Sequence, residues 1–426
     1  MERAHQSMAS NSHEMFVTPE DYVDWDKYVE QCDRIELRDR DRQRCKDSIR
    51  YLRTVLGEGY LRRAQAQRNP TILRLLLNSA PAARLTLIRF AEALTALEDA
   101  PNFKAVLRRI KRRVSRPEHL DEAAEGMSVV GVAHNFSRAG FAIEFEPDVS
   151  VPNRFGVHGP KKPDMKITNP VTGEEIIVEV SRMRASDHQN RAERTFEVIW
   201  GVLVGEGMHS DPEALKDVLR PRHILPYALI HRGMEVDELK SVVGDIRRLV
   251  SRVRAGGAFG EMIIPGVIEV GIASYDDHER ALEWAAARGI KRTTFVEGPG
   301  ILADEIARAK VKLSTKVKQL PEDRPGIVVM PAGENLILFA FDAKGIAEAL
   351  AEEVGKYPKL LRAILFHTFD DGRDDSASVS IGPHTLARRI RSDGAVEQSL
   401  IVRNARCAHA VGVETLEMMD QAFAAG

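Results

Sequence analysis

Two acidic residues stand in short apolar segments that follow one another closely along the chain. Asp164 belongs to residues 163–167 (PDMKI), and Glu179 belongs to residues 175–181 (EIIVEVS). Burying a carboxylate is costly unless it is paired with a cation or bound to a metal ion. The local sequence supplies no such partner for the two acids, so a divalent cation is the expected one.

Two such carboxylates favour phosphodiester hydrolysis. This reaction needs charge stabilisation on the attacking and leaving oxygens, and Mg²⁺ held by carboxylates can supply it. In a strand, every second side chain lies on the same face. Glu179 and Ser181 therefore share one face of their strand, and Asp164 and Lys166 share one face of theirs. These four polar side chains are expected to converge on one site.

Further predicted elements surround these two strands and would position them. Residues 118–138 have apolar side chains at helical intervals, and Gly140 ends this helix. Residues 141–146 alternate as a strand. Farther along, the sequence predicts a helix at 299–319 and a buried strand at 325–330. The order is a helix, three strands, a second helix and a further strand.

In these residues and this order the chain resembles the PD-(D/E)xK superfamily, the restriction-endonuclease-like nucleases. Pro163-Asp164 is similar to the first half of the family motif and Glu179-Val180-Ser181 to the second, with fourteen residues between the two acids. The resemblance implies an α/β fold with a restriction-endonuclease-like mixed-sheet core. It also implies that Asp164 and Glu179 bind Mg²⁺ or Mn²⁺ and that the protein is a metal-dependent nuclease.

The resemblance assigns roles to residues outside the motif. Members of the family have a third acid on the preceding helix, and Glu125 is the candidate here. The later helix carries Lys312, Lys316 and Gln319 at helical spacing. They are similar to the lysine and glutamine stripe that many relatives direct toward the scissile phosphate.

The motif departs from the family at Ser181, because active relatives have a lysine there. A neutral hydroxyl cannot stabilise the charge that develops on the phosphate. Lys166, which lies on the same strand face as Asp164, is the first substitute for the missing lysine, and Lys316 is the second. The departure keeps a second interpretation open, a catalytically degenerate nuclease-fold protein that binds nucleic acid or a protein partner.

The two acids also have purely structural explanations. Asp164 follows Pro163 and could be a turn residue, and Glu179 could be an outward charge that protects an edge strand. A basic helix near residues 104–114 has two explanations as well, since its arginines and lysines either solvate one face or contact phosphates. A third interpretation sets the resemblance aside and treats the Arg-rich helices as docking sites for an acidic partner.

The chain has 426 residues, of which 43% are hydrophobic, and is long enough for more than one unit. Residues 1–116 have helical spacing and almost no strand signal, which predicts a helical N-terminal region. Residues 117–426 are expected to form the nuclease-like α/β domain. A long α/β insertion is expected within it at about residues 185–297.

Composition limits the partners and the compartment. A net charge of −2 argues against a protein that coats nucleic acid by overall electrostatics. The apolar runs are too short for a membrane span or an export signal, and none of the three cysteines has metal-ligand spacing. We therefore expect a cytoplasmic protein without a membrane partner. The resemblance implies nucleic acid as the partner, DNA more than RNA, and is compatible with a homodimer.

Overall fold

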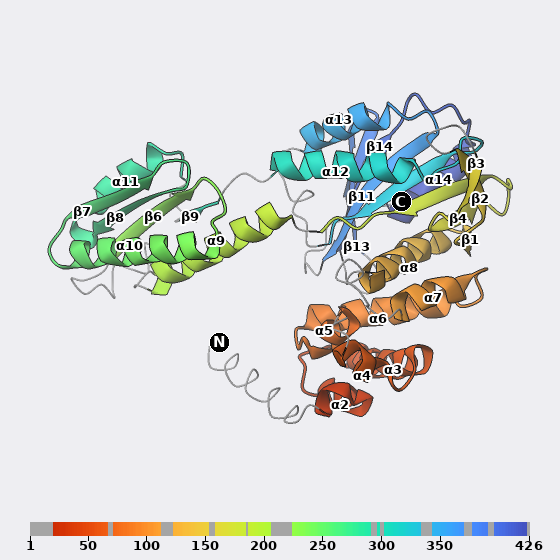
Figure 1. Ribbon diagram of the computed structural model, residues 1–426, viewed down its shortest axis with the longest axis horizontal. Coiled ribbons are helices and arrows are strands. Elements are labelled where there is room, and N and C mark those ends of the chain that lie inside the picture. The colour runs from red at the N-terminus through yellow and green to blue at the C-terminus, as the bar shows by residue number, and fades with distance from the viewer. Residues whose placement is uncertain are drawn as a thin grey trace. The chain divides into compact units, whose positions relative to one another are not determined.

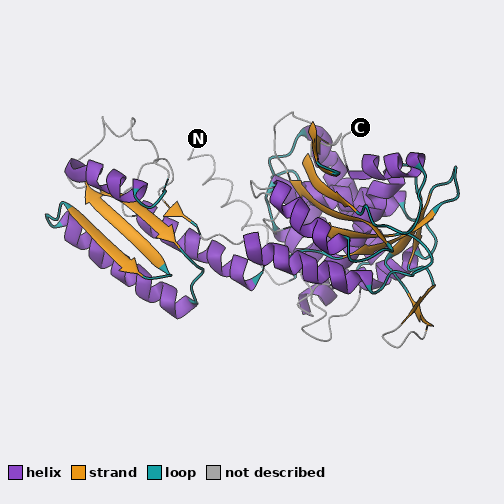
Figure 2. Ribbon diagram, turned by 90° about the horizontal axis from the view of Figure 1, so that it is seen from above, coloured by secondary structure: helices purple, strands orange, loops and turns teal. Residues whose placement is uncertain are grey.

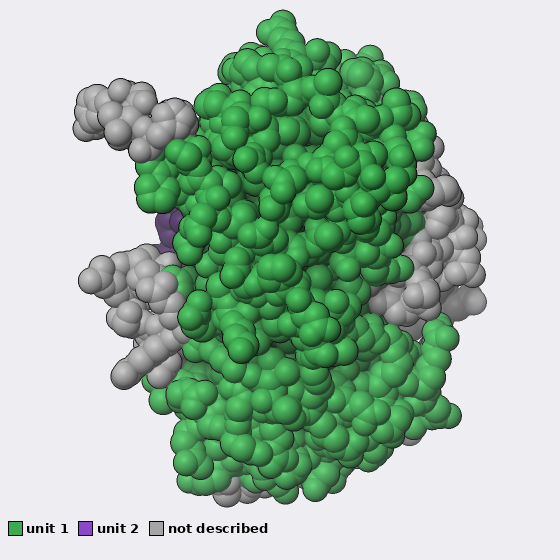
Figure 3. Space-filling view, turned by 90° about the vertical axis from the view of Figure 1, so that its right-hand side faces the viewer, with its two compact units in different colours: residues 1–183, 308–333, 337–426 green, residues 184–307, 334–336 purple. Residues whose placement is uncertain are grey.

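The computed structural model describes eleven stretches of the chain: residues 20–66, 71–111, 122–152, 158–184, 186–205, 224–290, 296–298, 302–333, 343–369, 377–390 and 396–423. The chain divides into two compact units, coloured separately in Figure 3. The first unit comprises Met1–Met183, Arg308–Gly333 and Ile337–Gly426, and the second comprises Arg184–Ala307 and Glu334–Leu336. Both units are of mixed α/β structure.

The first unit is built on an eight-stranded mixed sheet (Figure 1). In order across the sheet its strands are β1 (Ala142–Phe145), β4 (Met165–Thr168), β5 (Glu175–Val180), β10 (Gly326–Pro331), β11 (Leu360–Phe369), β14 (Val396–Arg403), β13 (His384–Ile390) and β12 (Ala377–Ile381). Strand β10 runs parallel to both β5 and β11, and the other neighbouring pairs are antiparallel. A separate hairpin pairs β2 (Val149–Pro152) with β3 (His158–Lys161).

Two helices cover one face of this sheet, α8 (Glu122–Arg138) and α14 (Val413–Phe423). Their apolar side chains share one core with alternate residues of the strands, because successive strand side chains point to opposite faces. Helices α12 (Leu302–Val317) and α13 (Ala343–Val354) lie together on the opposite face (Figure 1). Lys310 of α12 pairs with Glu352 of α13 at 3.3 Å.

The N-terminal helices pack beneath α8 as part of the first unit. They are η1 (Asp21–Val23), α2 (Trp25–Gln31), α3 (Asp39–Leu56), α4 (Tyr60–Ala66), α5 (Thr71–Leu77), α6 (Pro81–Ala96) and α7 (Phe103–Lys111). Their buried side chains belong to the same core as those of α8 and the sheet. The region predicted at 1–116 is helical where it is described, but it does not form a unit of its own.

The second unit has three layers, and Figure 2 shows helices on both sides of its four-stranded sheet. Its elements are α9 (Asp187–Gly205), β6 (Ile224–Ile230), α10 (Val236–Arg254), β7 (Phe259–Ile264), β8 (Ile268–Ser274), η4 (Tyr275–Asp277), α11 (His278–Ala286) and β9 (Val296–Glu297). The sheet order is β7-β8-β6-β9, with α9 and α10 on one face and α11 on the other. Gly271 lets α11 approach, since a Cβ there would come within 2.5 Å of the Trp284 ring.

The second unit takes the place of the insertion expected at about 185–297, and its main segment is longer at the C-terminal end. Residues 336–341 (LILFAF) form an apolar run of strand length that predicts a further strand, and they lie outside the described residues. The sequence did not predict the hairpin of β12 and β13. Among the described helices, none has the length and apolar character needed to cross a membrane.

Candidate active site

A tight hairpin brings the two acids together. Strands β4 and β5 pair with Met165 opposite Val178, so the same register continued by one residue sets Asp164 beside Glu179. The turn is closed by a hydrogen bond from the Gly173 N–H to the Asn169 carbonyl at 2.8 Å. Gly173 has a φ of 74°, a left-handed conformation that favours glycine.

Asp164 is buried, with 5% of its surface exposed, and both of its carboxylate oxygens are engaged. Oδ1 accepts a hydrogen bond from Nη1 of Arg109 at 2.7 Å. Oδ2 accepts one from the Val180 N–H at 2.9 Å and lies 3.5 Å from Nζ of Lys316. Burial by itself would raise the pKa of Asp164, but the two cations and the N–H hold it below its usual value. Asp164 is therefore a buried, ionised carboxylate.

Glu179 is even more deeply buried, with 1% exposed. Its Oε2 accepts a hydrogen bond from Lys316 at 2.8 Å, while Oε1 is buried and receives no hydrogen bond. Burial, followed by the charge of Asp164, raises the pKa of Glu179 to about 8. Loss of the Glu179 proton would place a second negative charge beside Asp164, which a bound cation would compensate.

Lys316 comes from α12, on the face of the sheet opposite to α8, and contacts both carboxylates. It lies near the end of α12, and 22% of its side chain is exposed. Burial alone would lower the pKa of its ammonium, but Asp164 and Glu179 raise it above the usual value. Of the two lysines proposed to replace the motif lysine, Lys316 is the one that contacts both acids.

Lys166 is held elsewhere. Although it lies on β4, two residues from Asp164, its ammonium pairs with Glu144 on β1 and Glu175 on β5, each at 2.8 Å. In this structure Lys166, the first candidate to replace the motif lysine, pairs with these two acids and with neither Asp164 nor Glu179. The sequence contains both acids, but only strand pairing brings them to Lys166.

The other predicted residues lie at or near this site. Ser181 is buried just after β5, and its N–H donates to the Val329 carbonyl at 2.9 Å. Glu125, in the first turn of α8, acts electrostatically on both Arg109 and Lys316, adding to the larger effect of Asp164 in raising their pKa. Gln319 lies in the turn that follows α12, and no hydrogen bond joins its side chain to Asp164 or Glu179, all of them described residues.

Arg109 is the site residue that the sequence did not predict. It comes from α7, within the basic segment that could either solvate a face or contact phosphates, and reaches Asp164. Close packing of α7 on α8 brings it there. A Cβ on Gly126 of α8 would lie 2.7 Å from Cγ1 of Ile110, the residue after Arg109. The only signal in the sequence was the position of Arg109 beside the apolar stripe of Val106 and Ile110.

The donor set is suited to a hard divalent cation. Asp164 and Glu179 offer carboxylate oxygens, and Oε1 of Glu179 is buried without a hydrogen bond. The described residues contain no group of three or more His, Cys, Asp or Glu side chains that could hold a metal ion. Mg²⁺ commonly binds one or two carboxylates and completes its shell with water and substrate phosphate.

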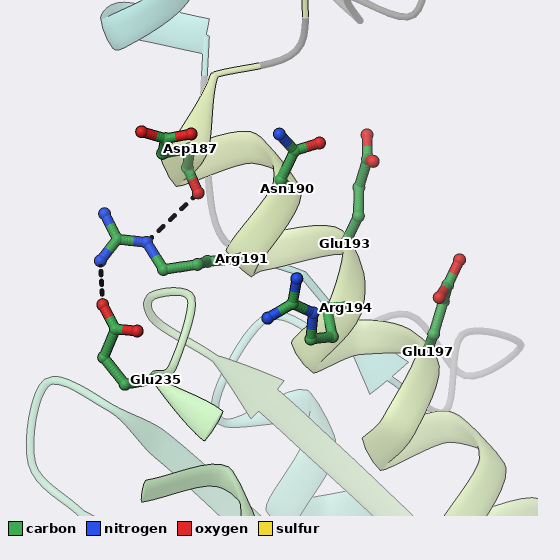
Figure 4. Close-up of a pocket in the computed structure, with 7 residues that line it drawn as sticks. All are labelled: Asp187, Asn190, Arg191, Glu193, Arg194, Glu197 and Glu235. Atoms are coloured by element: carbon green, nitrogen blue, oxygen red, sulfur yellow. Dashed lines mark hydrogen bonds and ion pairs between the residues drawn. The ribbon is translucent and has the colours of Figure 1, made fainter. Parts of the chain in front are cut away.

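A separate pocket lies on the second unit, along α9 (Figure 4). Its lining residues are Asp187, Asn190, Arg191, Glu193, Arg194, Glu197 and Glu235. Arg191 pairs with Glu235 and donates to the carbonyl of Asp187. The lining side chains are exposed or half-buried, and this polar surface lacks the paired buried carboxylates of the first unit.

The chain was compared with protein-family models, with curated proteins and with solved structures, and no match was found in any of the three.

Proposed function

We propose that this protein is a metal-dependent nuclease that hydrolyses phosphodiester bonds, with DNA favoured over RNA as the substrate. The observation that carries this proposal is the contact of Lys316 with both buried acids, 2.8 Å from Glu179 and 3.5 Å from Asp164. Two buried carboxylates on adjacent strands with a lysine between them form the constellation that the motif requires. The lysine reaches it from α12 instead of from position 181.

The order of elements supports a restriction-endonuclease-like core within the larger mixed sheet. From α8 the chain passes through β1, β4 and β5 to α12 and β10, with the β2–β3 hairpin and the second unit inserted. Four of these strands are neighbours in the order β1-β4-β5-β10, and β5 and β10 are parallel. A helix, three strands, a helix and a strand is the order expected of that core.

In the proposed site Asp164 and Glu179 hold Mg²⁺ or Mn²⁺, and the bound cation supplies Lewis acidity at the phosphate. Lys316 favours the ionised form of both acids and would place a positive charge near the phosphate oxygens as they become more negative. Glu125 lies within electrostatic range and contributes to the outer part of the site. Preorganised charges of this kind stabilise a transition state without reorganisation during the reaction.

The test is cleavage of plasmid DNA, single-stranded DNA and RNA in the presence of Mg²⁺ or Mn²⁺. Wild type is compared with Asp164→Ala, Glu179→Ala and a matched surface variant, Glu58→Ala, which removes an exposed acid paired with Arg53. We expect metal-dependent cutting that both site variants lose and Glu58→Ala keeps. Cutting that survives Asp164→Ala would contradict the proposal.

A second candidate function is supported by the same geometry. Both oxygens of Asp164 are already occupied by protein donors, and Ser181 stands at the motif lysine position. A degenerate nuclease-fold protein that binds nucleic acid or a protein partner would have such an internally neutralised site. Thermal unfolding with Mn²⁺ separates the two, because a site that does not bind the cation gains no stability from it.

A further inference from the structure

Helix α7, which carries Arg109, also has a basic exposed stripe. Lys104, Arg108 and Lys111 recur at intervals of four and three residues, which places them on one side of the helix. All three are exposed, and none forms an ion pair with another residue that the structure describes. The opposite side of α7 is anchored by the buried residues Val106 and Ile110. Among the described residues, the stripe therefore carries positive charge that no ion pair compensates.

Arg109 connects this helix to the carboxylates. Its side chain is 27% exposed, against 6% for the side chain of Asp164, so the guanidinium lies between the buried acid and the surface. Burial alone would lower its pKa, but Asp164 first, then Glu146 and Glu125, raise it. Glu146 has an unusual left-handed φ of 43°, and its N–H donates to the carbonyl of Asp164 at 3.1 Å.

When both acids are ionised, the charges at the site balance in the absence of a divalent cation. Asp164 and Glu179 are matched by Arg109 and Lys316. For Asp164 to serve as a metal ligand, Oδ1 must be released, because Oδ2 is held by the Val180 N–H. Arg109 is the donor on Oδ1 and also the more exposed of the two cations. A divalent cation would leave the site with two excess positive charges, which phosphodiester anions would offset.

We propose that α7 is the phosphate-binding helix of this site and that Arg109 exchanges partners there. In the free protein Arg109 occupies Oδ1 of Asp164. When Asp164 serves as a ligand, the guanidinium turns to the phosphate of a nucleic-acid strand, whose flanking phosphates lie against Lys104, Arg108 and Lys111. Guanidinium suits this task because its planar donors match two phosphate oxygens at once. This inference rests on the proposed nuclease function and specifies how the substrate backbone is held.

The test separates cation binding from strand binding. The variants are Arg109→Gln, Arg109→Lys, the pair Lys104→Gln with Arg108→Gln, and a matched surface control, Arg53→Gln, whose arginine pairs with Asp26 and Glu58. Cation binding is measured as the shift in unfolding temperature with Mn²⁺ alone. Strand binding is measured by fluorescence anisotropy of a labelled DNA duplex in Ca²⁺ over a series of salt concentrations.

For Arg109→Gln we expect the Mn²⁺ shift to persist or increase, because a competitor for Oδ1 is gone. DNA affinity should fall on the order of 10- to 100-fold, as for loss of a charge-assisted hydrogen bond. The salt slope should decrease by about 1. Arg109→Lys keeps the charge and tests the site if the glutamine variant does not fold. The Lys104 and Arg108 pair should lower DNA affinity and leave the Mn²⁺ shift unchanged, and Arg53→Gln should resemble wild type.

The inference is overturned if Arg109→Gln binds DNA with wild-type affinity and salt dependence, or if it loses the Mn²⁺ shift as Asp164→Ala would. In the first case Arg109 does not contact the strand, and in the second it only supports the shape of the site. Either result leaves the nuclease proposal intact when wild type cuts DNA. Failure of the nuclease proposal is recognised separately, by metal-dependent cleavage that is absent from wild type itself.

Discussion

The ammonium nitrogen of Lys316 lies 2.8 Å from Oε2 of Glu179, although 137 positions separate the two residues in the chain. The same nitrogen is 3.5 Å from Oδ2 of Asp164. One ammonium group from α12 thus contacts two buried acids that lie on or beside neighbouring strands of the sheet.

Replacing Lys316 by Gln should destabilise the metal-free protein by about 3–5 kcal/mol, because it leaves buried negative charge without its main partner. Mn²⁺ should recover part of this loss by taking the place of the ammonium charge. Urea unfolding in EDTA and in Mn²⁺ measures both effects, and Lys310→Gln on the same helix is the control, since Lys310 pairs only at the surface with Glu352. Equal stability of Lys316→Gln and wild type in EDTA would contradict the expectation.

Moving the lysine should restore function if Lys316 replaces the motif lysine. Ser181 lies two residues beyond Glu179 on the same strand face. The double variant Ser181→Lys with Lys316→Gln should therefore regain part of the metal-dependent cleavage that Lys316→Gln loses. Cleavage rates of the single and double variants measure this recovery. If the double variant is as inactive as Lys316→Gln, the two positions are not equivalent.

Lys166→Met should leave both the Mn²⁺ response and any cleavage near wild-type values. Its ammonium pairs with Glu144 and Glu175, which are partly exposed, so its removal is expected to cost about 1 kcal/mol or less. Urea unfolding measures the stability, and cleavage rates measure the activity. A large loss of cleavage with little loss of stability would show that Lys166 takes part in the reaction.

The stability of the metal-free protein should fall between about pH 4.5 and pH 8. The pKa of Glu179 is raised from 4.5 to about 8 in the folded protein. Its stabilising contribution is therefore fully present below pH 4.5 and is lost as the pH rises through about 8. Asp164, whose pKa is lowered from 3.8, loses its contribution only at lower pH, and Lys316, whose pKa is raised from 10.5, only at higher pH.

Unfolding free energies across this range test the assignment, and Glu179→Gln should remove the slope. The Mn²⁺ response should change in the opposite direction and grow as the pH approaches 8, since the cation binds ionised Glu179. A wild-type profile as flat as that of Glu179→Gln would exclude the shifted pKa of Glu179.

Gly126→Leu should disturb the site from a distance. Even a Cβ at this position would lie 2.7 Å from Cγ1 of Ile110, so a larger side chain must push α7 away from α8. Overpacking of this kind destabilises by about 1–3 kcal/mol. Displacement of α7 should also withdraw Arg109 from Asp164 and lower the affinity for DNA. The control is Gly131→Leu on the same helix, where a Cβ would meet open space, and anisotropy with labelled DNA measures the difference.

Local patterns in the sequence determined the two strands that carry Asp164 and Glu179. Alternating apolar residues and the Gly173 turn are enough to predict a hairpin, and the helical spacing on either side predicts α8 and α12. These features extend over a few residues, so their physical cause is visible in the chain itself. The hairpin of β12 and β13 was not predicted, because several positions of these strands carry polar or charged residues (ASVSI and HTLARRI) that weaken the apolar pattern.

Tertiary structure decided which cations reach the acids. Arg109 and Asp164 are 55 positions apart, and their contact depends on how closely α7 packs on α8 at Gly126. Lys166 has the spacing from Asp164 that would place it at the site, but its ammonium pairs with acids on the two neighbouring strands. Lys316 reaches the site because α12 covers that face of the sheet. Spacing along the chain specifies which face a residue occupies, but the partner of a buried charge is selected by the packing of distant elements.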